Sequence, residues 1–301
     1  MDLLEQTKKL CKLYHIITAR SKGQNFLIKE EIYDEMVAAA DLKPDETVLE
    51  VGSGLGFLTA KLAACAGRVI AVELDDKLAG VLKTGLIAKK VKNVEVVNEN
   101  VLDIKIQPPL FPPYQGGHYK IVANLPYNIT SIFLRKFLEA ETKPELMALM
   151  LQKEVAERIT ASPREIPTIS RGAKRISRGK PGKMSLLAVS VQFYANAEII
   201  KFVSKEFFWP KPEVDSAIVR IKLNPPSSPF VKGGIKEKEF FQLVKFGFSA
   251  KRKMLKNNLA AGFKIDQGEA GSRIIKAGFN GKIRAQELSV DDWLKLFTVF
   301  Q

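Results

Sequence analysis

The sequence has few of the residues that indicate secretion, metal binding or membrane insertion. It contains only 2 cysteines and 2 histidines in 301 residues, and none of the four lies near another with the spacing of a metal site or a catalytic triad. No apolar run approaches the roughly 18 residues that a membrane-spanning helix needs. Residues 1–20 mix acids and bases and lack the apolar core of a signal peptide. These absences predict a cytoplasmic protein with reduced thiols, no membrane anchor and no metal.

The charged residues are unbalanced. Lys and Arg number 47 against 33 Asp and Glu, which gives a net charge of +14. An excess of this size indicates a polyanionic partner, either nucleic acid or an anionic membrane surface, although a generally basic proteome would also produce it. The hydrophobic share of 46% is enough for a buried core, so wholesale disorder is excluded.

Short apolar runs alternate with helical patterns from about residue 46. We expect strands at 47–54, 68–75, 93–101, 119–127 and 146–152, with helices at 57–66, 76–90 and 131–141 between them. Two later runs, 185–199 and 216–223, also have the composition of strands. Apolar strands that alternate with helices are typical of a mainly parallel sheet covered by helices on both faces. The sequence therefore predicts a doubly wound, Rossmann-like α/β domain.

The remaining segments suggest two domains. We predict a first domain over 1–223, with a helical extension at 1–21 and a basic loop at 163–183, and a small all-α domain over 231–301. The proline-rich segment NPPSSPF at 224–230 is the predicted linker. The apolar face of the helical extension is expected to consist of Leu3, Leu4, Leu10, Leu13 and Ile17.

Three glycines separate the first predicted strand from its helix. Gly52, Gly54 and Gly56 lie in VLEVGSGLGFLT, where glycine lets the backbone approach a ligand and the helix N-terminus supplies unpaired N–H groups. Glu73 ends the next predicted strand, and a carboxylate there can accept hydrogen bonds from ribose hydroxyls. The pattern predicts a nucleoside cofactor, either NAD or S-adenosyl-L-methionine. A tight structural turn is the alternative.

Two details favour S-adenosyl-L-methionine. The glycine spacing is GxGxG rather than GxGxxG, and Glu50 precedes the glycines, where a carboxylate suits a cationic ligand better than a pyrophosphate. Asn100 follows the third strand, where its side chain could hydrogen-bond the cofactor adenine. An NAD-linked dehydrogenase would need GxGxxG and a hydride-handling acid or base, and the sequence shows neither.

The most specific motif is IVANLPYNIT, at the end of the fourth predicted strand. The Asn124 carboxamide can accept a hydrogen bond from an exocyclic amine, and the Leu125 carbonyl can accept a second because Pro126 stops regular pairing. Tyr127 offers an aromatic face on which a base can stack. These four residues predict a pocket for a target base, with an ordinary strand-end turn as the alternative.

The chain resembles the ribosomal RNA adenine N6,N6-dimethyltransferases of the KsgA type. Matching blocks run along nearly the whole length and include KGQNFLIKEEI, VLEVGSGLGFLT, VIAVELD, IVANLPYNIT, MLQKEVAERI and FFWPKPEVDSAIVRI. The C-terminal pieces FSAKRKMLKNNL and RAQELSVDDW match as well. The resemblance implies a class I S-adenosylmethionine-dependent methyltransferase domain followed by a helical domain that contacts RNA.

The resemblance also implies residue roles. Asn25 and Leu27 would close over the cofactor, Gly52 would contact its methionine end, and Glu73 its ribose. Asn100 and Val101 would hold its adenine ring, and Phe208 would form the second wall of the slot for the target base, opposite Tyr127. Gly54, Leu74 and Asn124 complete the predicted cofactor site.

The implied function is dimethylation of adenine N6 in the 16S rRNA of the small ribosomal subunit, in ribosome maturation, by a monomer. Hydrogen bonds from both N6 protons to Asn124 and Leu125 would favour a tetrahedral nitrogen whose lone pair faces the methyl donor. Two alternatives remain, which are a resistance-type 23S rRNA adenine N6-methyltransferase and a non-catalytic RNA-binding assembly factor.

Two departures from the family pattern stand out. The family usually has Asp where this chain has Asn100, so we expect weaker cofactor binding at most. The basic stretch is longer than usual, and it serves either as an added RNA contact or as a solvated loop. Lys251, Arg252, Lys253 and Lys256 form a second basic cluster, which is expected to contact phosphates unless it is a solvated helix face. The predicted RNA contacts are Arg171, Lys174, Arg175, Lys251, Arg252 and Lys253.

Overall fold

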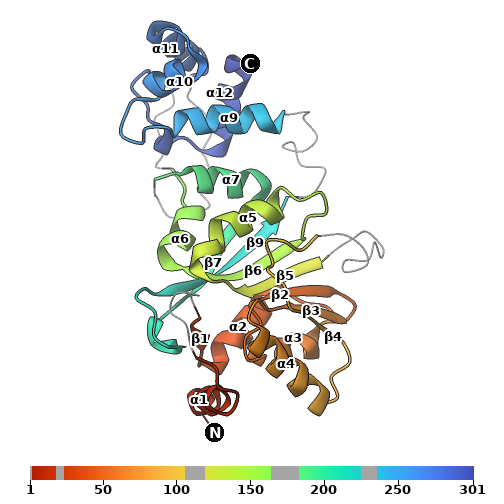
Figure 1. Cartoon of the computed structure of the whole chain (residues 1–301). Helices are drawn as coiled ribbons and strands as arrows, with labels where there is room; N and C mark the ends of the chain where they lie inside the picture. The colour runs from red at the N-terminus through yellow and green to blue at the C-terminus, as the bar shows by residue number, and fades with distance from the viewer. Residues whose placement is uncertain (1, 18–23, 106–118, 164–182, 225–235) are drawn as a thin grey trace. The chain divides into compact units, whose positions relative to one another are not determined.

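The computed structural model describes residues 2–17, 24–105, 119–163, 183–224 and 236–301 (Figure 1). The basic residues Arg171, Lys174 and Arg175 lie outside these ranges, as does most of the predicted linker. The chain divides into two compact units, one of residues 1–156 and 197–223 and one of residues 157–196 and 224–301. The predicted first domain had included 157–196, which the contacts group with the C-terminal helices.

A sheet of seven strands dominates the first unit, in the order β4-β3-β2-β5-β6-β9-β7. Its first five strands are mutually parallel, and β9 runs antiparallel to β6. The central strands are buried along almost their whole length, as strands covered on both faces must be. The strands are β2 (Thr47–Val51), β3 (Arg68–Val72), β4 (Val94–Val97), β5 (Tyr119–Asn124), β6 (Leu146–Gln152), β7 (Ala195–Val203) and β9 (Ser216–Leu223).

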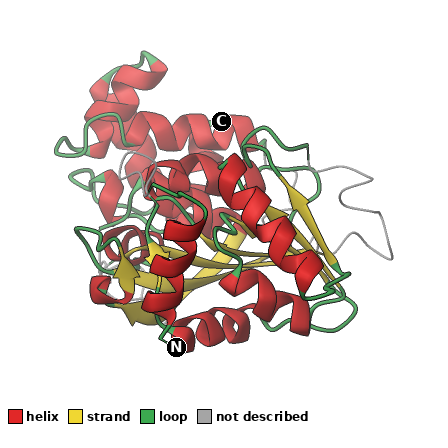
Figure 2. Ribbon diagram, turned by 60° about the horizontal axis from the view of Figure 1, so that its bottom comes forward, coloured by secondary structure: helices red, strands yellow, loops and turns green. Residues whose placement is uncertain are grey.

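Helices cover both faces of this sheet (Figure 2). Helices α2 (Glu30–Ala40), α3 (Phe57–Cys65) and α4 (Asp76–Ala88) lie on one face, and α5 (Thr130–Leu138) lies on the other (Figure 1). The chain runs outward through β2, β3 and β4 and then returns to β5 on the other side of β2. This return creates a topological switch point between β2 and β5, and the predicted α/β fold class is confirmed.

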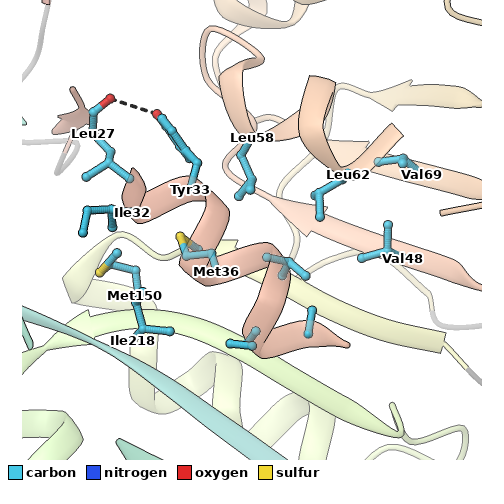
Figure 3. Packing of buried hydrophobic residues seen from close by; sticks show 14 of the residues in the cluster. Leu27, Ile32, Tyr33, Met36, Val48, Leu58, Leu62, Val69, Met150 and Ile218 are labelled. Carbon is cyan, nitrogen blue, oxygen red and sulfur yellow. Dashed lines mark hydrogen bonds between the residues drawn. The ribbon is translucent and has the colours of Figure 1, made fainter. Parts of the chain in front are cut away.

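The core between α2 and the sheet is apolar. Met36 of α2 is fully buried beside Ile32, and both lie near Met150 of β6 and Ile218 of β9 (Figure 3). The hydroxyl of Tyr33 donates a 2.9 Å hydrogen bond to the carbonyl of Leu27. This bond ties α2 to the short strand β1 (Phe26–Leu27), which pairs antiparallel with β8 (Phe208–Trp209). Segments about 180 residues apart in the chain are thus held together beside the sheet.

One expectation about secondary structure was wrong. The run at 185–199, expected as a strand, forms helix α7 (Leu186–Tyr194) before β7 begins at Ala195. The Ser185 hydroxyl caps α7 by accepting from Ala188 N, and an apolar run this short has no periodicity that separates helix from strand.

The N-terminal helix α1 (Leu3–Leu13) keeps part of its expected apolar face. Leu3 packs against the hydrophobic core, and Thr7 and Cys11 are buried as well, whereas Leu13 is exposed and Ile17 lies beyond the helix end, 85% exposed.

The second unit is helical. Helices α9 (Glu237–Gly247), α10 (Leu255–Phe263), α11 (Gln267–Lys276) and α12 (Val290–Phe300) pack against one another, and α9 and α12 also contact α7. Trp293 is fully buried, and the ring of Phe240 stacks on Phe193 with centroids 4.8 Å apart. Helix α6 (Lys153–Ile159) spans the boundary between the units. No helix within the described ranges is long and apolar enough to cross a membrane.

Candidate active site

A pocket of about 340 Å³ lies at the carboxyl ends of β2, β3, β4 and β5, in the first unit. This is the position at which doubly wound sheets bind ligands, and the volume is that of a small-molecule site. The pocket is lined by every residue that the sequence assigned to cofactor or target base, although their roles stay predictions. They are Asn25, Leu27, Gly52, Gly54, Glu73, Leu74, Asn100, Val101, Asn124, Leu125, Pro126, Tyr127 and Phe208.

The glycine turn lies directly against the end of β5. Gly52 has a φ of +74°, and a Cβ built on it would lie 3.4 Å from the carbonyl oxygen of Asn124. The N–H of Gly54 donates to one oxygen of Glu73 at 2.8 Å, and the N–H of Asp75 donates to the other at 2.9 Å. The Glu73 carboxylate is therefore held in place at the pocket wall, with lone pairs left for ligand hydroxyls.

Glu50 is a buried acid beside the buried hydroxyl of Thr59. Its side chain is 1% exposed, and apart from that hydroxyl neither carboxylate oxygen has a hydrogen-bond donor among the residues that the structure describes. Burial raises the pKa of Glu50 to about 8. The Thr59 hydroxyl opposes this rise, and the nearby carboxylate of Glu73 adds to it. Burial also raises the pKa of Glu73, although the backbone N–H groups of Asp75 and Gly54 oppose this. A pocket with two such acids favours a cationic ligand over a phosphate.

The loop after β4 carries the predicted adenine contacts. Oδ1 of Asn100 accepts a 3.0 Å hydrogen bond from the N–H of Leu102, and Val101 is buried. The ammonium of Lys136, from α5, donates to the carbonyls of Leu102 and Ile104 at 2.7 and 2.6 Å. On the facing wall, the side chain of Leu74 is 64% exposed and offers an apolar surface to a ring.

The target-base motif keeps its acceptors available. Nδ2 of Asn124 donates to the carbonyl of Asn25 at 3.4 Å, which leaves the carboxamide oxygen free to accept. The carbonyl of Leu125 has no backbone donor within the described part of the chain. Tyr127 begins a short 3₁₀ helix, η3 (Tyr127–Ile129), and its hydroxyl lies 2.9 Å from Oγ of Ser216. Phe208, from β8, is buried in the lining of the same pocket.

Several supporting residues escaped the sequence analysis. Ser216 and Lys136 support the site only through tertiary contacts, which no local sequence pattern predicts. Gln24 donates to the Asp75 carboxylate at 3.4 Å, and Asp75 also caps α4 by accepting from Lys77 and Leu78. An Asp directly before a helical pattern is a capping signal, so Asp75 could have been found from the sequence.

The predicted RNA contacts in the second unit are solvent-accessible. Lys251, Arg252 and Lys253 are all exposed in the segment between α9 and α10. Within the described ranges, no group of three or more His, Cys, Asp or Glu side chains has the arrangement of a metal site.

Comparisons with known proteins define the class of this site. The solved structure of the 23S rRNA methyltransferase ErmE matches with a TM-score of 0.68 and 28% identity, covering 91% of this chain and 99% of that chain. A dimethyladenosine transferase from Plasmodium falciparum matches the fold with a TM-score of 0.70 at 24% identity, covering 90% and 96%. The fold is that of a class I methyltransferase.

Sequence comparison identifies the family. The model of the ribosomal RNA adenine dimethylase family matches residues 18–301. A protein of Dehalococcoides mccartyi named ribosomal RNA small subunit methyltransferase A is 40% identical over 299 residues, with 99% of this chain and 94% of that protein covered. A protein of the same name from Ligilactobacillus salivarius is 36% identical, with coverage of 97% and 93%. The chain belongs to the ribosomal RNA adenine dimethylase family and is an enzyme, which excludes the dehydrogenase alternative.

Proposed function

We propose that this enzyme uses S-adenosyl-L-methionine to dimethylate the N6 amines of adenines in the 16S rRNA of the small ribosomal subunit, as a step in ribosome maturation. The observation that carries the proposal is the close approach of Gly52 to Asn124. A methyl donor held by the glycine turn and an amine held by Asn124 would share one pocket.

The acids and glycines of the pocket fit the cofactor. Glu50, buried with only the Thr59 hydroxyl beside its carboxylate, suits its ammonium group, and the tethered carboxylate of Glu73 suits its ribose hydroxyls. Asn25, Leu27, Gly52 and Gly54 would enclose the methionine end, and Leu74, Asn100 and Val101 would surround the adenine. S-adenosyl-L-methionine supplies a methyl group on a positively charged sulfur, so no metal or acid is needed to activate it.

The remaining lining residues would hold the target base. The oxygens of Asn124 and Leu125 would accept from the two N6 protons and so direct the nitrogen lone pair away from the ring. Tyr127 and Phe208 would pack against the faces of an adenine taken out of its stack, and Pro126 would keep the Leu125 carbonyl unpaired. For the second methylation only one N–H remains, so the same oxygens would hold a rotated, monomethylated amine.

The relatives support the small subunit as the source of the RNA. Proteins that match at 32 to 42% identity over nearly the whole chain are named ribosomal RNA small subunit methyltransferase A, whereas the 23S rRNA enzyme ErmE is 28% identical. The net charge of +14 suits a ribosomal substrate. We further propose that the enzyme acts as a cytoplasmic monomer.

The direct test uses small and large ribosomal subunits that lack adenine methylation. The enzyme is incubated with each and with labelled S-adenosyl-L-methionine, and the nucleosides are identified by mass spectrometry. We expect N6,N6-dimethyladenosine in small-subunit RNA only. Label in large-subunit RNA would overturn the choice of substrate.

An Asn124→Ala variant is the matched control. At saturating S-adenosyl-L-methionine we expect it to transfer no more than about a hundredth as much label, since it lacks one of two acceptors in the reacting geometry. If the wild-type protein binds subunits but neither cofactor nor product, the assembly-factor alternative is correct instead.

A further inference from the structure

The side-chain amide of Asn100 has a fixed orientation. Its oxygen accepts a 3.0 Å hydrogen bond from the N–H of Leu102. Because only the oxygen of an amide group can accept a hydrogen bond, Nδ2 must lie on the side of the amide that faces away from this N–H. The backbone carbonyl of Asn100 accepts from the N–H of Asp103 at 2.8 Å, which closes a tight turn. The oxygen cannot rotate toward the pocket without loss of a bond.

The residue that donates to this oxygen is itself held in place. Lys136 donates to the carbonyls of Leu102 and Ile104, so Leu102 is hydrogen-bonded at both of its backbone groups, by Asn100 at its N–H and by Lys136 at its carbonyl oxygen. Lys136 is partly buried, and burial lowers the pKa of its ammonium. The turn from Asn100 to Ile104 is therefore a preorganised support for Asn100 and Val101, which line the pocket.

One hydrogen-bonding group of Asn100 is left for a ligand. Nδ2 has no partner among the described residues, and Asn100 lines the pocket. An amide nitrogen donates and cannot accept. A purine beside it can therefore be recognised through a ring nitrogen or a 6-oxo group, each of which accepts, but not through a 6-amino group, which donates.

We propose that Asn100 determines purine specificity in the cofactor site by presenting a hydrogen-bond donor. Its side chain therefore makes no hydrogen bond to the 6-amino group of the cofactor. The inference rests on the proposed function, because it takes the ligand to be S-adenosyl-L-methionine. An aspartate at position 100 would keep the bond to Leu102 with one oxygen and present the other to the 6-amino group. Whether residue 100 carries an amide or a carboxylate then determines how strongly the site prefers a 6-amino purine to a 6-oxo purine.

The test compares two product analogues that differ only at the purine 6-position, S-adenosylhomocysteine and S-inosylhomocysteine. Their dissociation constants are measured by isothermal titration calorimetry with the wild-type protein and with Asn100→Asp. We expect the wild type to bind the two within about tenfold, because one neutral hydrogen bond separates them at most. Asn100→Asp should bind the adenosyl form about 3- to 10-fold tighter and the inosyl form weaker, so that the ratio widens to about a hundredfold.

Asn128→Asp is the control for added charge. Asn128 is exposed in the lining of the same pocket, so its replacement adds the same charge elsewhere and should shift both affinities alike. A wild-type preference above a hundredfold for the adenosyl form, or an unchanged ratio in Asn100→Asp, would overturn the inference alone. If S-adenosylhomocysteine does not bind at all, the proposed cofactor is wrong and the inference falls with it.

Discussion

The hydroxyls of Tyr127 and Ser216 lie 2.9 Å apart, although 89 residues separate them in the chain. Ser216 is fully buried at the start of β9, and Tyr127 is the last of the four predicted target-base residues, just after β5. Because a hydrogen bond at the far end of the ring limits movement of the hydroxyl, Ser216 holds in place the ring on which the target adenine is expected to stack. Ser216 is thus a positioning residue that touches no ligand itself.

We predict that Tyr127→Phe and Ser216→Ala have similar effects that do not add. Each removes the same hydrogen bond and leaves the aromatic ring in place, so kcat should fall about 3- to 10-fold while S-adenosylhomocysteine binding is unchanged. The double variant should be no slower than either single one. Single-turnover methylation of small subunits measures the rates, and multiplicative losses in the double variant would show that the two hydroxyls act independently.

Glu50 leads to a prediction about pH. Its pKa is raised from an ordinary 4.5 to about 8 in the folded protein, so between these values the folded state holds a proton that the unfolded state has lost. Stability therefore falls as pH rises from 4.5 to 8 and levels off above that. The Glu50→Gln variant does not lose stability in this way. Its free energy of unfolding should therefore exceed that of the wild type by an amount that grows between pH 4.5 and pH 8, to a value on the order of 4 kcal/mol.

Denaturant unfolding at pH 5 and pH 8.5, without ligand, measures this difference. The same variant should bind S-adenosylhomocysteine less tightly, because the carboxylate that suits the ligand ammonium is gone. Greater stability with weaker binding is the signature of a functional acid. If Glu50→Gln is less stable at both pH values, the carboxylate has a structural partner instead.

The local sequence pattern predicts some parts of the fold and of the site but not others. The parallel strands and the glycine turn could be predicted because each has a signature within about ten residues, which is an apolar run or GxGxG. Helix α7 could not, because its short apolar run suits either secondary structure. The contacts of Ser216 and Lys136 join segments 89 and 34 residues apart, and only the folded chain brings these two side chains to Tyr127 and Leu102.

Gly56 allows a direct test of the turn before α3. Its φ is +80°, and a Cβ there would lie 2.5 Å from a methyl carbon of Leu82. Gly56→Ala should destabilise the protein by about 1 to 3 kcal/mol, from the left-handed backbone and from displacement of Leu82. Gly80→Ala in α4 is the matched control, because its Cβ would meet nothing within 4 Å. It should stabilise by about 0.5 to 1 kcal/mol. Equal melting temperatures for the two variants would refute this reading of the turn.

The basic cluster between α9 and α10 leads to a prediction about salt. If Lys251, Arg252 and Lys253 contact phosphates, their replacement by Gln should weaken binding to small subunits and lower the slope of log K against log salt by up to about 2 to 3. The control replaces Lys89, Lys90 and Lys92, which are equally exposed at the end of α4, and removes the same charge from the other unit. Affinity is measured by filter binding from 50 to 300 mM KCl, where cofactor affinity should not change. Equal slopes for the two triple variants would mean that net charge alone, and no contact in the C-terminal unit, attracts the RNA.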